Sequence, residues 1–167
     1  CNSTEDAYVS NSYSFSGNNS VVIKQYNDIV RDHGLLTNGI CEINFQMFIP
    51  TGKAGYFNTL ADFAPPNYVW AMQVFFNSSG TGTLDAAGQN AAAFSYPQNC
   101  WIPVKVVADL VIDRGEFWLN GVLIHSWQWS KGTFGSPTIP LQLDGTDFYG
   151  YSTNDQMYVD DYNITHF

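Results

Sequence analysis

The sequence predicts an all-β fold, an antiparallel two-sheet sandwich or a barrel, from three observations. Short segments with strand periodicity recur along the 167 residues, separated by Gly, Pro, Asn and Ser turn signals roughly every 8–12 residues. No segment combines a helical period with capping residues. Aromatic residues make up 16% of the chain and charged residues 13%, a composition that suits short strands and tight turns. The length allows one real core, so residues 1–167 are expected to form a single module.

The first part of the chain contains two strong strand patterns. Residues 41–49 alternate cleanly, with Ile43, Phe45 and Met47 on one side and polar residues on the other. Residues 68–77 are apolar on both faces, which predicts a central strand. Further strands are expected at 20–26, 55–63, 83–87 and 91–96, with weak alternation at 7–16 and a short turn at 27–33.

The second part continues in the same way. A strand is expected over 101–112, where Val104, Val106, Ala108 and Leu110 share one face. A turn at 113–115 leads into a hairpin, residues 131–140 form a loop, residues 141–151 are mixed, and 157–167 form a last strand.

The dipeptide Asn120-Gly121 lies between two apolar runs and predicts a hairpin with a type I′ turn. A two-residue loop pairs Leu119 with Val122, Trp118 with Leu123, Phe117 with Ile124 and Glu116 with His125. One face then carries Phe117, Leu119, Val122 and Ile124 and belongs to the core. The other face carries Glu116, Trp118, Leu123, His125, Trp127 and Trp129. This aromatic face is either the inner wall of a second layer or a platform for a ligand.

Net charge and the absence of long apolar runs narrow the function. The net charge is −9, the pI is about 4.3, and the six Lys and Arg residues are scattered singly. Nucleic-acid binding rests on neutralising phosphates, so this composition disfavours it, and it disfavours polyanionic glycans as well. A neutral polysaccharide is the better partner. No apolar run approaches the roughly 20 residues of a transmembrane helix.

The three cysteines leave alternatives open. Cys41 and Cys100 each open a strand pattern, so they either form a bridge between strand starts or remain two free thiols. Cys1 is either the lipid-bearing first residue of a lipoprotein or the product of a cut within a longer protein.

Several stretches resemble a known family. They are residues 39–50, Gly55-Tyr56-Phe57, 101–106, 117–121 and Tyr158-Val159-Asp160-Asp161-Tyr162. Together they are similar to the concanavalin A-like, laminin G-like β-sandwich modules of large secreted proteins of Bacteroidota. The resemblance implies a two-sheet jelly roll in a secreted or cell-surface multidomain protein, often exported by the type IX system. The superfamily includes lectins, carbohydrate-binding modules, glycanases, polysaccharide lyases and adhesion domains, so the fold does not fix the activity.

No catalytic motif stands out in the sequence. A retaining glycanase needs two carboxylates about 5–5.5 Å apart, and only three Glu residues occur, none in a suitable run. Glu116 and His125 form either an acid–base pair or a polar pair at a strand end. The Tyr-Phe-Lys run typical of alginate lyases of this fold is absent, because Asn58 follows Tyr56-Phe57. The three His residues show no zinc spacing, and no Gly-x-Ser-x-Gly occurs.

Oxygen ligands for a structural calcium ion gather late in the chain, with Asp144, Asp147 and Asp160 as the candidates. The alternative is that these carboxylates cap turns and bond strand ends.

The aromatic platform is the remaining signal for function. Sugar rings stack on Trp and Tyr, while Asn, Gln, Asp and His bond their hydroxyl groups. The predicted platform is Trp118, His125, Trp127 and Trp129, and its second wall is Tyr149, Tyr151 and Asn154, with Tyr68 and Trp70 as further candidates. Trp118 fits the core and the platform equally, whereas the polar neighbours of Trp127 and Trp129 favour exposure.

The leading hypothesis is a non-catalytic carbohydrate-binding module that docks a polysaccharide on this face. The alternatives are a structural or adhesion domain without a sugar site, and a glycanase or polysaccharide lyase of the same fold.

Overall fold

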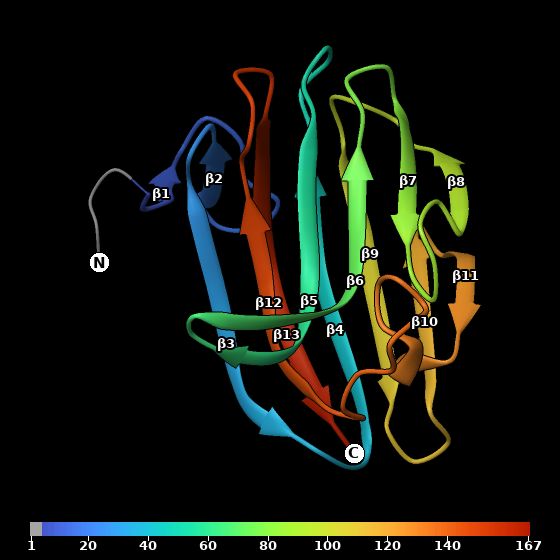
Figure 1. The fold of residues 1–167 in the computed structure, drawn as a ribbon. Helices are drawn as coiled ribbons and strands as arrows, with labels where there is room; N and C mark the ends of the chain where they lie inside the picture. The colour runs from blue at the N-terminus through green and yellow to red at the C-terminus, as the bar shows by residue number, and fades with distance from the viewer. Residues whose placement is uncertain (1–4) are drawn as a thin grey trace.

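The computed structural model describes residues 5–167, so the alternatives for Cys1 lie outside the described residues. Two antiparallel sheets pack face to face (Figure 1). The seven-stranded sheet has the order β1-β2-β13-β4-β9-β10-β11 and the six-stranded sheet the order β3-β12-β5-β6-β7-β8. The strands are β1 (Tyr8–Ser10), β2 (Ser20–Lys24), β3 (Asp28–Leu36), β4 (Ile40–Phe48), β5 (Gly55–Ala64), β6 (Asn67–Phe76), β7 (Thr81–Asp85), β8 (Ala92–Ser95), β9 (Trp101–Asp109), β10 (Arg114–Leu119), β11 (Val122–Trp127), β12 (Leu143–Tyr149) and β13 (Gln156–His166), with a 3₁₀ turn η1 (Trp129–Lys131) after β11.

The main core fills the space between the sheets. Alternate residues of β4 and β9 are buried there, as the clean alternation of residues 41–49 predicts. Phe45 is central, with its ring 5.1 Å from that of Phe57 and 5.2 Å from that of Phe148. β6 pairs with both β5 and β7, so the prediction of a central strand is confirmed.

A smaller apolar cluster lies on the outer face of the seven-stranded sheet. Val22, Phe48 and Tyr158 form it, and Trp101 packs against it. The ring of Tyr13, from the segment between β1 and β2, stacks on Phe48 at 4.2 Å and covers the cluster.

One expected turn is a strand. Residues 28–33 of this segment form the start of β3, which pairs with β12 as an edge strand of the six-stranded sheet. Most β3 side chains are exposed or half-buried, so the segment lacks the apolar periodicity that predicts a strand.

The Asn120-Gly121 turn is confirmed, because both residues have positive φ, 51° and 77°. The expected register holds for Leu119–Val122 and Trp118–Leu123 and then shifts by one residue, so Phe117 pairs with His125 and Glu116 with Ser126. A one-residue shift exchanges the two faces of a strand. Trp127 therefore pairs with Gly115 on the core face and not with the outer residues.

The two cysteines are unbridged. Cys41 pairs with Ala108 near the end of β9, whereas Trp101, next to Cys100, pairs with Phe48. Because β4 and β9 are antiparallel, their first residues lie at opposite ends of the sheet. Cys41 is a buried free thiol and Cys100 an exposed one.

The part of the chain that the structure describes contains no helix with the length and hydropathy needed to cross a membrane.

Candidate functional site

The outer face of the six-stranded sheet is hollowed into a groove of about 1210 Å³. Side chains from β3, β12, β5 and β6 form its floor, alternating with the residues that face the core. The β5–β6 hairpin crosses in front of β12 and β3 in Figure 1 and contributes Phe63 to the wall. Asp144 holds this hairpin and β3 together, because its carboxylate accepts hydrogen bonds from the backbone N–H groups of Phe63 and Leu35, at 2.8 and 2.7 Å.

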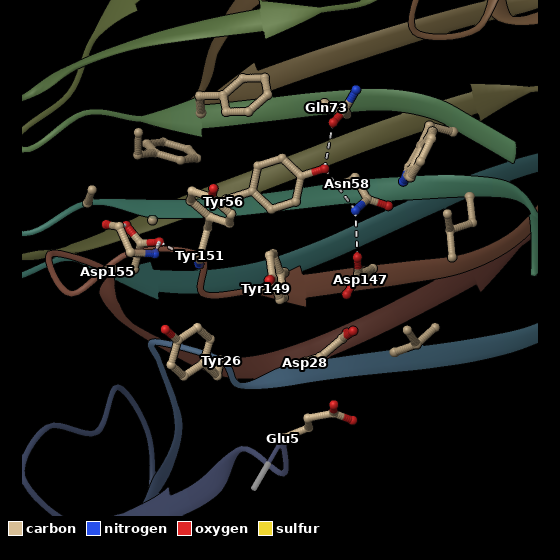
Figure 2. Close-up of a pocket in the computed structure, with 18 of the residues that line it drawn as sticks. Glu5, Tyr26, Asp28, Tyr56, Asn58, Gln73, Asp147, Tyr149, Tyr151 and Asp155 are labelled. Carbon is tan, nitrogen blue, oxygen red and sulfur yellow. Dashed lines mark hydrogen bonds between the residues drawn. The ribbon is translucent and has the colours of Figure 1, made fainter. Parts of the chain in front are cut away.

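A row of polar side chains crosses the floor (Figure 2). Gln73, Asn58 and Asp147 are successive cross-strand partners on β6, β5 and β12. The Tyr56 hydroxyl donates to Gln73 Oε1 at 2.7 Å, and Asn58 Nδ2 donates to the Tyr56 oxygen at 3.1 Å and to Asp147 Oδ2 at 2.6 Å. Asp28 of β3 lies beside Asp147 and ends the row. Hydrogen bonds within the row hold each side chain in place before a ligand arrives.

The row carries unusual electrostatics at Asp147. Burial and then the negative charge of Asp28 raise the pKa of Asp147 to about 7, while the Asn58 hydrogen bond opposes the shift. Burial also raises the pKa of Tyr56, so its hydroxyl keeps its proton. Oδ1 of Asn58 and Oδ1 of Asp147 are buried and have no hydrogen-bond partner. Buried acceptors without a partner have an unmet need for a hydrogen-bond donor.

Aromatic rings border the row on both sides. Tyr149 and Tyr151 lie towards the start of β5, with ring centroids 6.5 Å apart. Tyr68 and Trp70 of β6 line the hairpin end, and Trp70 is 40% exposed. A polar floor between aromatic walls is the arrangement expected for a sugar chain, whose rings offer apolar C–H faces and hydroxyl edges.

The groove is acidic. The described residues that line it include Glu5, Asp6, Asp28, Asp147 and Asp155. The full set of described lining residues contains no Lys, Arg or His. A polyanionic chain would therefore enter against like charge and without a partner for its carboxylates.

The prediction of an aromatic platform on the hairpin is wrong for Trp127 and Trp129. Trp127 is 6% exposed and Trp129 is 0% exposed, so neither can stack on a sugar. The register shift turns Trp127 inward, and the Trp129 ring lies in the core with its Nε1 donating to the Gln142 carbonyl at 2.9 Å.

Trp118 and His125 belong to the seven-stranded sheet, away from the groove, and Lys105 Nζ lies 4.6 Å from the centre of the Trp118 ring. Glu116 accepts hydrogen bonds from Trp118 and Arg114, and its strand partner is Ser126 and not His125.

The expected second wall is partly assembled. Tyr149 and Tyr151 line the groove. Asn154 lies in the loop before β13, exposed, and its carbonyl accepts a hydrogen bond from the Ala54 N–H at 3.1 Å.

The expected calcium ligands do not come together. Asp144 bonds two backbone N–H groups, Asp147 lies in the groove, and Asp160 of β13 accepts from the backbone N–H groups of Phe15, Ser16 and Asp161. Among residues 5–167, no group of three or more His, Cys, Asp or Glu side chains is arranged to hold a metal ion. The structure thus shows the alternative role, bonding of turns and strand ends, for Asp144 and Asp160.

Comparison with known proteins shows the fold. No protein-family model matches the chain, and no curated protein matches it in sequence. An alginate lyase of polysaccharide lyase family 7, AlgAT5, superposes with a TM-score of 0.64 at 13% identity, covering 98% of this chain and 83% of the lyase. The galectin LEC-6 of Caenorhabditis elegans superposes at 0.55 and 11% identity, covering 86% and 94%. A sialidase superposes at 0.63 and 11% identity over 96% of this chain, which spans 16% of the sialidase. The chain therefore has the concanavalin A-like jelly-roll fold.

Proposed function

We propose that the protein is a non-catalytic carbohydrate-binding module whose ligand is a non-acidic polysaccharide lying in the groove. The observation that carries the proposal is the hydrogen-bonded row from Gln73 to Asp147 with exposed aromatic rings on both sides. The row supplies fixed hydrogen-bonding groups, and the rings supply stacking surfaces. The fold shared with a galectin and with polysaccharide lyases supports a sugar ligand.

Binding without catalysis fits the chemistry of the floor. A glycosidase keeps its two carboxyl groups about 5 Å or more apart, so that a sugar carbon or a water fits between them. Asp28 and Asp147 instead lie side by side, and the charge of Asp28 raises the pKa of Asp147. A polyuronate lyase must offset the charge of the uronate, and the described lining of the groove has no Lys, Arg or His for this task.

The experiment is a binding screen of the folded protein against neutral polysaccharides, such as glucans, xylans, mannans and galactans, with alginate and pectate as acidic comparisons. We expect binding to at least one neutral chain and none to the acidic chains. Trp70→Ala and Tyr149→Ala should each weaken binding about tenfold, which corresponds to ~1.4 kcal/mol. Trp118→Ala is the matched control, because it removes a half-buried Trp from the other sheet.

Equal loss of affinity in Trp118→Ala, or no loss in Trp70→Ala and Tyr149→Ala, would remove the groove as the binding site. Absence of binding to every non-acidic polysaccharide would favour the structural or adhesion alternative.

We further propose that the module acts outside the cell within a longer protein. Finding the parent chain only in the cytoplasmic fraction would contradict this proposal.

A further inference from the structure

The centre of the groove floor offers hydrogen-bond acceptors to a ligand. Both amide hydrogens of Asn58 are already used, by Tyr56 and by Asp147. The remaining Oδ1 of Asn58 has no partner although this residue is only 1% exposed, and Oδ1 of Asp147 has none either. An acceptor buried without a partner costs on the order of 1–3 kcal/mol, so a ligand that brings donors to this point gains that amount.

The same place concentrates negative charge. Asp28 lies beside Asp147, and three more carboxylates line the groove without a basic side chain among the described lining residues. A sugar hydroxyl could fill the orphaned lone pairs but would leave Asp147 holding its proton beside Asp28. A cation would satisfy the acceptors and take the place of that proton.

An ammonium group suits the Asp147 and Asp28 pair. It has three donors and no acceptor, and Asp147 of β12 and Asp28 of β3 present carboxyl oxygens side by side, with Asn58 of β5 bonded to Asp147. Tyr149 is the strand partner of Asp28, so its ring lies next to this point and can pack on a sugar ring. Tyr56 and Gln73 continue the row with groups that bond hydroxyls, which an aminated sugar has and a lysine side chain lacks.

We propose that the centre of the floor binds the free amino group of a hexosamine unit, so that the preferred ligand is a basic, de-N-acetylated polysaccharide. This inference rests on the proposed glycan-binding function and names its substrate class. Asp147 and Asp28 are the specificity-determining residues, and Asn58 orients Asp147.

The test compares three oligosaccharides of equal length by calorimetry at about pH 6, where an amino group is charged: chitosan, chitin and cello-oligosaccharides. The first and last differ only in an ammonium group against a hydroxyl at each ring. We expect the chitosan oligosaccharide to bind at least tenfold more tightly than the other two. Asp147→Asn and Asp28→Asn should each remove this preference. Glu42→Gln, which changes the net charge equally but lies on the outer face of β4 in the other sheet, should keep it.

Equal binding of the chitosan and cello-oligosaccharides, or a preference that persists in Asp147→Asn, would overturn the inference and leave the glycan-binding function standing. So would a preference that requires calcium, or tighter binding of a lysine oligopeptide than of the chitosan oligosaccharide. No binding of the chitosan oligosaccharide while another polysaccharide binds in the groove overturns this inference alone. No binding of any glycan overturns both.

Discussion

Asn58 and Asp147 are cross-strand partners joined by a 2.6 Å hydrogen bond from the Asn58 amide to the Asp147 carboxylate, and each keeps one buried oxygen without a partner. The pair is therefore well positioned and incompletely satisfied. The unpaired acceptors lower the free energy of unfolding of the free protein, and a ligand that supplies donors removes this cost.

The pH dependence of stability should reveal this cost. The pKa of Asp147 is raised from 3.8 to about 7, so the folded protein holds this proton more tightly than the unfolded chain. The stabilising contribution is complete below about pH 4 and is lost as the pH rises through about 7. Three pKa units correspond to at most ~4 kcal/mol. Asp147→Asn stays uncharged and should be more stable than the wild type at about pH 8, by roughly 2–4 kcal/mol, and equal to it at about pH 4.

Urea unfolding at several pH values measures the difference between the two proteins. Glu42→Gln, a carboxyl on the other sheet, is the control and should follow the wild-type profile. Parallel profiles of Asp147→Asn and the wild type would show that Asp147 is not protonated more readily in the folded state.

The elements that the sequence predicts well are those set by local signals. The alternation of residues 41–49 and the Asn120-Gly121 turn each specify their geometry within a few residues, and both are confirmed. The register beyond Trp118 could not be predicted, because the irregularity between Phe117 and Trp118 leaves no signature in the sequence. That single shift moves Trp127 from the predicted platform into the core.

The groove could be predicted only in part. Asn58, Gln73 and Asp147 are polar residues next to the buried residues Phe57, Val74 and Phe148 on their strands, so their position on the face opposite the core is a local signal. Their proximity depends on the strand order β3-β12-β5-β6, in which β12 inserts between strands that precede it by many residues. The sequence predicts Tyr149 and Tyr151 as one wall of a site. The residues opposite them could not be predicted, because their position depends on this non-local pairing.

Gly115 makes room for the Trp127 ring, since a Cβ atom on Gly115 would lie 2.6 Å from Cζ2 of Trp127. Gly115→Ala should therefore lower the free energy of unfolding by roughly 1–3 kcal/mol. Trp127→Ala should lower it by roughly 3–5 kcal/mol, because the ring is buried. In the double variant the added methyl group occupies vacated space, so the double variant should be more stable than the sum of the two losses implies.

Thermal unfolding of the three variants and the wild type measures this coupling. Gly121→Ala serves as the comparison, because a Cβ there meets no atom within 4 Å, although its φ of 77° still strains an alanine. Additive losses in the double variant, or an unchanged melting temperature in Trp127→Ala, would place the ring outside the core.

The two described cysteines should differ sharply in reactivity. Cys100 is exposed, whereas Cys41 is buried and burial raises its pKa to about 11, so little thiolate forms there at neutral pH. Maleimide should label Cys100 in the native protein and Cys41 only after unfolding. Peptide mapping by mass spectrometry identifies the labelled residue. A Cys41–Cys100 disulfide-linked peptide, or labelling of Cys41 at the rate of Cys100, would contradict the structure.

Asp144 should be a structural brace of the groove wall. Its carboxylate is the acceptor for the backbone N–H groups of Leu35 and Phe63, which fasten β3 and the β5–β6 hairpin. Asp144→Ala leaves both donors without this partner and should lower the free energy of unfolding by roughly 2–4 kcal/mol. Amide hydrogen exchange should become faster at Leu35 and Phe63 in particular, because the loss is local.

Asp62→Ala, on the same hairpin but without this link, is the control and should leave both amides as protected as in the wild type. The brace requires no ion, so calcium and a chelator should give the same melting temperature. The contrary result would be a chelator that lowers the melting temperature of the wild type and of Asp62→Ala but not that of Asp144→Ala. Asp144 would then be a metal ligand and not a brace.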